Sequence, residues 1–149
     1  MKRSEQDIRF QWDLTKIYPD TAAWEAAMQE AEAALAPLAA IPGTLGTSKE
    51  AFKKGLDTIY ASMFKVELPY TYAFLKKTED GSVAENQEMA ARSESLLVKF
   101  SAATAFLNPE ILAIPAEKLD EWMQDEALEE LRRISRLCHG LLELIIERS

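Results

Sequence analysis

The sequence is poor in the residues that most hydrolases use for chemistry. It has one cysteine, Cys138, and one histidine, His139, among 149 residues. A single cysteine excludes an intramolecular disulfide, so nothing points to an oxidising compartment and we expect a cytoplasmic protein. A single histidine excludes the zinc motif H-E-x-x-H, which needs two histidines. We therefore expect this chain to contain no catalytic, cofactor-binding or metal-binding residues, and we assign no substrate-binding residues.

Positive charge is also scarce. Lysine and arginine total 17 against 25 aspartates and glutamates, which gives a net charge of -8 and a pI near 4.8. A nucleic-acid partner requires a clustered positive surface. The densest basic cluster, Arg132, Arg133 and Arg136, follows Glu129 and Glu130, which can pair with it at helical spacings. We expect no nucleic-acid partner.

Long apolar runs are missing as well. No stretch approaches the roughly 18 consecutive apolar residues of a membrane span, and the densest run, residues 141–146, is interrupted by Glu143. The first seven residues carry charges of both signs and no apolar region of a secretory signal. The sequence therefore predicts no membrane association.

The residues that are abundant favour helices. Hydrophobic residues make up 48% of the chain, glycines number only 5 and prolines 6, and strong helix formers dominate. No segment shows the strict alternation of a strand. We predict an all-α fold, one domain over residues 1–149, built as an antiparallel array of about five to six helices with long heptad-like helices and Pro-kinked connections.

Breakers and caps place the first predicted helix. Pro19 ends any helix before Asp20 and Thr21, which are good N-cap residues, and Pro37 should kink or end the helix that follows. Residues 41–46 carry the breakers of a loop. The apolar positions that recur at steps of three and four in this helix are Trp24, Met28, Ala31, Leu35 and Leu38.

Two capping-box patterns predict the next two helices. Residues 47–50 match one box, and the helix behind it should run to a kink at Pro69 and end at a turn over residues 78–81. Residues 82–85 match a second box. The apolar stripes of these helices are Phe52, Leu56, Ile59 and Met63, continued by Tyr70, Tyr72, Phe74 and Leu75, and then Met89, Leu96, Phe100, Ala103 and Leu107.

Prolines divide the remainder of the chain. Asn108 should cap, and Pro109 start, a new helical turn, and Pro115 should do the same. A last helix is predicted from about Asp125. Its apolar residues are Leu128, Leu131, Ile134, Cys138, Leu141, Leu142, Ile145 and Ile146.

For each candidate catalytic or metal-binding group, we prefer a structural interpretation to a functional one. His139 and Glu143 share a helical face, but two ligands do not make a catalytic zinc site. The carboxylate pairs 125–126 and 129–130 are typical of a solvated helix face. Aromatic residues at helical spacing usually belong to a core, although they could also line a peptide groove. That aromatic set is Tyr60, Tyr70, Tyr72 and Phe74.

Two stretches of sequence carry a family resemblance. They are Trp12-Asp13-Leu14-Thr15-Lys16-Ile17-Tyr18-Pro19, followed by a helix with Trp24, and Phe106-Leu107-Asn108-Pro109-Glu110-Ile111-Leu112-Ala113-Ile114-Pro115. Residues 72–75 and 97–101 lie between them in the same order. Together they resemble the N-terminal helical region of oligoendopeptidase F metallopeptidases over residues 10–135, whereas residues 136–149 depart from that family.

The resemblance implies a function that this chain does not complete. Members of the family are cytosolic enzymes that cut oligopeptides with a zinc held by H-E-x-x-H and a downstream glutamate, beyond the region matched here. The implied role is a non-catalytic N-terminal domain, or a truncated fragment from a natural truncation, a frameshift or an engineered sequence. Its uncovered apolar helix faces, particularly around Leu141, Leu142, Ile145 and Ile146, should form a homodimer or larger assembly, or bind a peptide or the catalytic domain. The alternative is a self-contained helical protein-interaction module.

Overall fold

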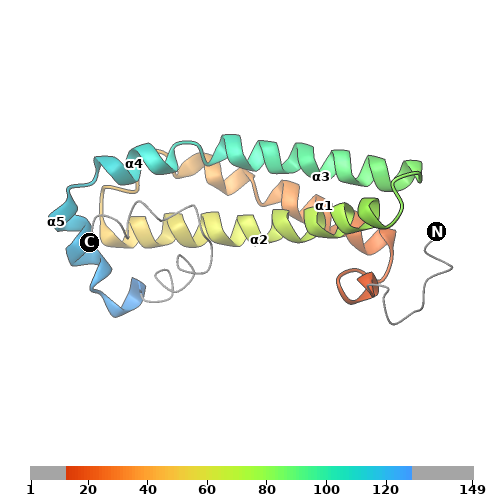
Figure 1. Ribbon diagram of the computed structural model, residues 1–149. Helices are drawn as coiled ribbons and strands as arrows, with labels where there is room; N and C mark the ends of the chain where they lie inside the picture. Colours follow the sequence, from red (N-terminus) through yellow and green to blue (C-terminus); the bar gives the residue numbers. More distant parts are fainter. Residues whose placement is uncertain (1–12, 129–149) are drawn as a thin grey trace. The chain divides into compact units, whose positions relative to one another are not determined.

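The computed structural model describes residues 13–128, and this part of the chain is helical without a strand. The predicted all-α class is confirmed, and residues 13–128 contain five α-helices, of which three are long. In chain order the elements are η3 (Leu14–Lys16), α1 (Thr21–Ala33), η4 (Ala36–Ala40), α2 (Lys49–Glu79), α3 (Ala84–Ala103), α4 (Leu107–Ala113), α5 (Ala116–Met123) and η5 (Glu126–Leu128), shown in Figure 1.

The chain divides into two compact units. Unit 1 comprises residues 1–36 and 62–102, and unit 2 comprises residues 37–61 and 103–149. Helix α2 contributes residues 49–61 to unit 2 and residues 62–79 to unit 1. The single domain over residues 1–149 stays a prediction.

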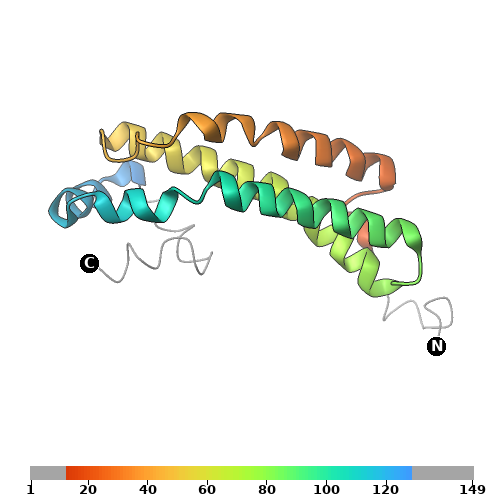
Figure 2. The ribbon, with the colours of Figure 1, turned by 90° about the horizontal axis from the view of Figure 1, so that it is seen from above.

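Unit 1 is a three-helix arrangement whose directions follow from its side-chain contacts. The Trp24 indole nitrogen of α1 donates to the Pro69 carbonyl of α2, and the Ser62 hydroxyl donates back to the Ala34 carbonyl, so α1 and α2 are antiparallel. Contacts between α1 and α3 instead join residues 64 to 67 apart in the sequence. These two helices therefore run parallel to each other and antiparallel to α2, as in the antiparallel array that we predicted, and Figures 1 and 2 show them beside α2.

The core of unit 1 uses the predicted apolar stripes. The indole of Trp24 is fully buried, and Met28, Leu96 and Phe100 are buried as the helical spacing requires. Leu35 and Met63 are only half-buried, and Phe74 is exposed, so the stripe of α2 faces the core less completely than predicted.

Some predicted caps form and others do not. Asp20 caps α1 by accepting from the Ala23 amide at 2.8 Å, as expected. The cap of α2 is Ser48, which accepts from the Ala51 amide, so the predicted box lies one residue too early. Ser82 does not cap α3 because its hydroxyl donates to the Asp80 carboxylate in the preceding turn.

The proline signals of the later helices also need correction. Asn108 and Pro109 lie inside α4, whose N-cap is Phe106 without a side-chain hydrogen bond. Pro115 is the N-cap residue of α5 rather than its first helical residue. Pro69 lies within the continuous helix α2. The last predicted helix falls outside the described residues except for the 3-10 turn η5.

Unit 2 holds the loop before α2 against α4 and α5. The Glu110 carboxylate of α4 accepts from the backbone amides of Gly43 and Leu45, and the Lys118 ammonium donates to the Gly46 carbonyl. Gly43 has φ of +81°, which a residue with a side chain rarely adopts. The buried apolar residues of this unit are Leu38, Ile41, Leu45, Phe52, Leu56, Ile59, Tyr60, Leu107, Ile111, Ile114, Leu119, Trp122 and Leu128.

One described segment has the length and hydropathy of a membrane span, contrary to our expectation. Residues Ala84–Ala113 reach a mean hydropathy of 1.3 over 18 residues, with 22% of that window buried. The chain turns within this segment, between α3 and α4, and Lys99 of α3 bonds to Glu32 of α1. Length and composition are therefore weak evidence for a span.

Candidate functional site

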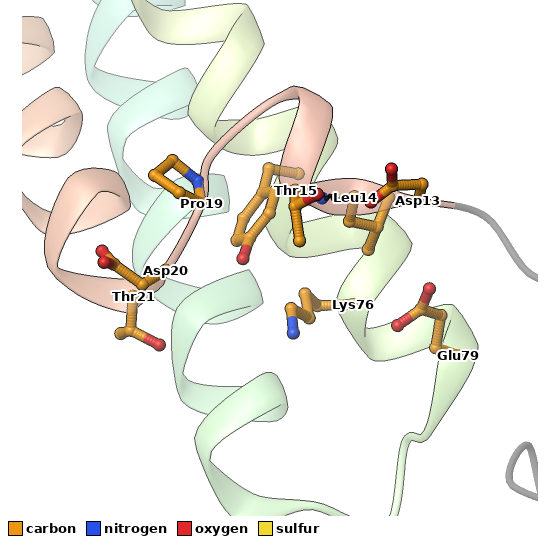
Figure 3. A pocket seen from close by; sticks show the side chains of 9 residues that line it. Asp13, Leu14, Thr15, Pro19, Asp20, Thr21, Lys76 and Glu79 are labelled. Carbon is orange, nitrogen blue, oxygen red and sulfur yellow. Dashed lines mark hydrogen bonds between the residues drawn. The ribbon is translucent and has the colours of Figure 1, made fainter.

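A pocket of about 290 Å³ opens in unit 1 where the segment around η3 meets the C-terminal part of α2. In Figure 3, Lys76 lies between Asp20 and Thr21 on one side and Glu79 on the other. Much of the wall comes from the stretch that resembles oligoendopeptidase F. The residues that line the pocket are Asp13, Leu14, Thr15, Pro19, Asp20, Thr21, Tyr72, Lys76 and Glu79.

Local hydrogen bonds set the shape of the wall. Asp13 caps η3, because one carboxylate oxygen accepts from both the amide and the hydroxyl of Thr15. The Thr15 hydroxyl bond lowers the pKa of Asp13, with burial opposing it. Asp20 caps α1 in the same way, so two carboxylates are fixed at helix starts on either side of Pro19. The segment between the caps is therefore held in place.

Tyr72 forms the aromatic part of the pocket. Its side chain is buried, its ring contacts the edge of the Tyr18 ring with centroids 5.2 Å apart, and the Lys76 ammonium lies 5.8 Å from its ring centre. Burial raises the pKa of the Tyr72 hydroxyl, and the negative charges of Asp20 and Glu85 raise it further. The hydroxyl therefore stays protonated at neutral pH beside carboxylates.

The described residues that line the pocket carry carboxylate, hydroxyl and ammonium groups. None of these described residues is a histidine or a cysteine. In the described part of the chain, no group of three or more histidine, cysteine, aspartate or glutamate side chains could hold a metal ion. The zinc that the family resemblance implies finds no ligand set there.

The aromatic residues considered as a peptide groove are dispersed. Tyr60 is buried in unit 2, and Tyr72 is the one that lines the pocket. Tyr70 is half-buried and stacks on the exposed Phe74 with centroids 6.3 Å apart. Sequence spacing could not identify the pocket, because Asp13 and Asp20 enter it from a segment without periodic apolar residues.

Of the other candidate groups, two lie in the described part of the chain, Asp125 and Glu126, and Glu126 is exposed as expected of a solvated helix face. Asp125 is not simply solvated as predicted, because it forms an ion pair with Lys49 at the start of α2. That pair raises the pKa of Lys49. The remaining candidates lie outside the described residues: Cys138, His139, Glu143, and the charged residues at 129, 130, 132, 133 and 136.

The fold and the pocket define the class of protein: a helical protein with a small polar pocket and, within residues 13–128, no cluster of metal ligands. No family model matches the chain, and no solved structure matches it. Curated relatives do match it, and all three given below are oligopeptidases.

The plasmid-encoded oligoendopeptidase F of Lactococcus lactis subsp. cremoris is 30% identical over 148 residues, which is 99% of this chain and 24% of that protein. The oligopeptidase PepF of Bacillus subtilis is 29% identical over 98% of the chain and 21% of its own length. The group B oligopeptidase PepB of Streptococcus agalactiae is 30% identical over 75% of the chain and 19% of its own length. The chain thus spans about a quarter of the relatives that it matches.

The chain is a homologue of the oligoendopeptidase F peptidases and corresponds to the N-terminal part of that family. The similarity extends over nearly the whole chain. The expectation that residues 136–149 depart from the family stays a prediction.

Proposed function

We propose that this chain is the non-catalytic helical part of an oligoendopeptidase F type peptidase. In this proposal, short peptides are hydrolysed in the cytoplasm by a zinc-binding part that these 149 residues do not include. The observation that carries the proposal is the match over 99% of the chain to only 24% of an oligoendopeptidase F.

The residue content supports the non-catalytic role. A zinc hydrolase needs about three protein ligands and an open position for water. The single histidine excludes H-E-x-x-H, and the described carboxylates do not cluster into a substitute. The role left for the helices is to support and enclose a peptide site that other residues complete.

Peptide hydrolysis by the purified chain tests this proposal. We expect no cleavage of fluorogenic oligopeptides above the buffer rate, with or without added zinc. The Lactococcus lactis oligoendopeptidase F serves as the positive control under the same conditions. Cleavage that copurifies with the chain and is abolished by a chelator would overturn the proposal.

An exposed apolar strip on α2, formed by Phe64 and Leu68, supports an interaction with the rest of the peptidase. Phe64 and Leu68, one helical turn apart in unit 1, are 53% and 50% exposed, and Phe74 is 51% exposed beside Tyr70. Exposed apolar patches of this kind mark interaction surfaces. We propose that the catalytic part covers the strip, and that the isolated chain covers it by forming a homodimer.

Light scattering of the chain at several concentrations tests this surface. We expect a dimer mass that shifts to the monomer mass in the double variant Phe64→Ser, Leu68→Ser. The exposed Val98→Ser on α3 serves as a matched control and should remain dimeric. A monomeric parent chain would contradict the homodimer. If the unmodified chain forms no dimer and also does not bind the catalytic part, the result would favour a self-contained interaction module.

A further inference from the structure

Charge within the pocket of unit 1 is unbalanced. Among the described residues of the lining, Asp13 and Asp20 each contribute a carboxylate, and Lys76 contributes an ammonium. Glu85 adds a further negative charge nearby, where it accepts from the hydroxyl of Thr21 at 3.2 Å. The potential in the pocket therefore favours a positive group.

A buried polar side chain faces the same space. Tyr72 lines the pocket with only 3% of its surface exposed, and its hydroxyl makes no hydrogen bond to a residue within 13–128. The hydroxyl oxygen is therefore available to a ligand in the pocket. Tyr72 shares the lining of this pocket with Asp20.

The two helix caps leave acceptors available. One oxygen of Asp20 accepts from Ala23, and one oxygen of Asp13 accepts from Thr15. The second oxygen of each carboxylate has no hydrogen-bond partner in the described part of the chain. A charged hydrogen-bond donor in the pocket can bond to these oxygens without disturbing either cap.

The chain itself shows that a cation is stabilised here. The Lys76 ammonium lies 5.8 Å from the Tyr72 ring centre, a cation–π distance. Lysine has a flexible stem, so its ammonium can move aside for a second positive group.

We propose that this pocket binds an organic cation, namely a guanidinium or primary ammonium group of the size of an arginine or lysine side chain. The cation donates to the second oxygen of Asp20 and to the Tyr72 hydroxyl oxygen, and it competes with Lys76. At about 290 Å³ the pocket lies at the small end of ligand sites, which suits one side chain rather than a whole peptide. This assignment does not depend on the peptidase function.

Titration of the isotope-labelled full chain, followed by two-dimensional NMR, tests the proposal. The probes are Nα-acetyl-arginine amide, Nα-acetyl-lysine amide, the neutral isostere Nα-acetyl-citrulline amide and the anionic Nα-acetyl-glutamate amide. The backbone amides of Thr15, Thr21 and Ala23 report on the pocket. We expect saturable shifts there with one or both cationic probes only, in the millimolar range of a single partly solvated ion pair.

Three variants with a matched control separate charge from fold. Asp20→Asn keeps a good N-cap but removes the charge, and Tyr72→Phe removes only the hydroxyl. Each should weaken binding roughly threefold to tenfold. Lys76→Met removes the competing ammonium and should tighten binding severalfold. Glu94→Gln removes an exposed carboxylate of α3 outside the pocket lining and should change nothing.

Each other outcome overturns the proposal. Equal binding of the citrulline probe, or equal affinity in Asp20→Asn and Glu94→Gln, would show that charge is not recognised. Binding of the glutamate probe that Lys76→Met abolishes would make the pocket an anion site. The absence of saturable shifts with every probe would show that Lys76 alone fills the pocket.

Discussion

Replacing Trp24 with phenylalanine tests whether its buried hydrogen bond holds α1 against α2. The indole is fully buried and donates to the Pro69 carbonyl at 3.0 Å. Phenylalanine keeps an aromatic ring beneath the Arg92 guanidinium, which lies 5.1 Å from the indole centre. It removes the donor and part of the side-chain volume.

The expected loss is the sum of two effects. Leaving the Pro69 carbonyl buried without a donor costs about 2 kcal/mol. The smaller ring leaves roughly 40 Å³ unfilled, which at about 24 cal/mol per Å³ costs roughly 1 kcal/mol. Trp24→Phe should therefore lower the free energy of unfolding by about 3 kcal/mol.

Trp122 provides the matched control. It is buried in unit 2 against Phe52, with ring centroids 5.6 Å apart, but it donates no hydrogen bond to a residue described by the structure. Trp122→Phe should therefore cost only the roughly 1 kcal/mol of lost volume. Urea denaturation followed by far-UV circular dichroism measures both variants. A loss for Trp24→Phe no larger than for Trp122→Phe would refute the role of the hydrogen bond.

Three further predictions concern charge, packing and capping. The hydrogen bond from Arg92 lowers the pKa of Glu25, so this pair stabilises the fold above the ordinary glutamate pKa of 4.5 and is lost as pH falls through the lowered value. In Glu25→Gln, the free energy of unfolding should therefore fall less on acidification, by less than about 1 kcal/mol. The same fall in the variant and the unmodified chain would contradict this. Gly55→Ala should lower the free energy of unfolding by about 1 kcal/mol, because its Cβ would lie 2.5 Å from a buried Leu45 methyl. This overpacking outweighs the helix propensity gained. Higher stability in urea would contradict this. Asp20→Ala should cost about 1 kcal/mol and Asp20→Asn almost nothing in thermal unfolding, and equal losses would argue against the cap.

Helical periodicity predicted much of the architecture. The spacing of Trp24 and Met28 correctly placed them in the core, and the Asp20 cap began α1 at the expected residue. These features depend on interactions within one helix turn, which a sequence displays directly.

The misses come from competing or long-range interactions. Ser82 fits a capping box by spacing, but its hydroxyl donates instead to the carboxylate of Asp80, two residues earlier. Pairs of residues far apart in the sequence, such as Glu25 with Arg92, 67 residues apart, join α1 to α3 and leave no signal in sequence spacing. The pocket combines residues of η3 and α2 in the same way, so no single segment of the sequence reveals it.

Reconstitution of a peptidase tests the central proposal most directly. The Lactococcus lactis oligoendopeptidase F, with the quarter that matches this chain deleted, is mixed with increasing amounts of this chain, and fluorogenic oligopeptide hydrolysis is measured. The deleted native segment supplied separately is the positive control. The account predicts low activity without the chain and a saturable rise when it is added. An unchanged rate, in an assay where the native segment restores hydrolysis, would contradict it.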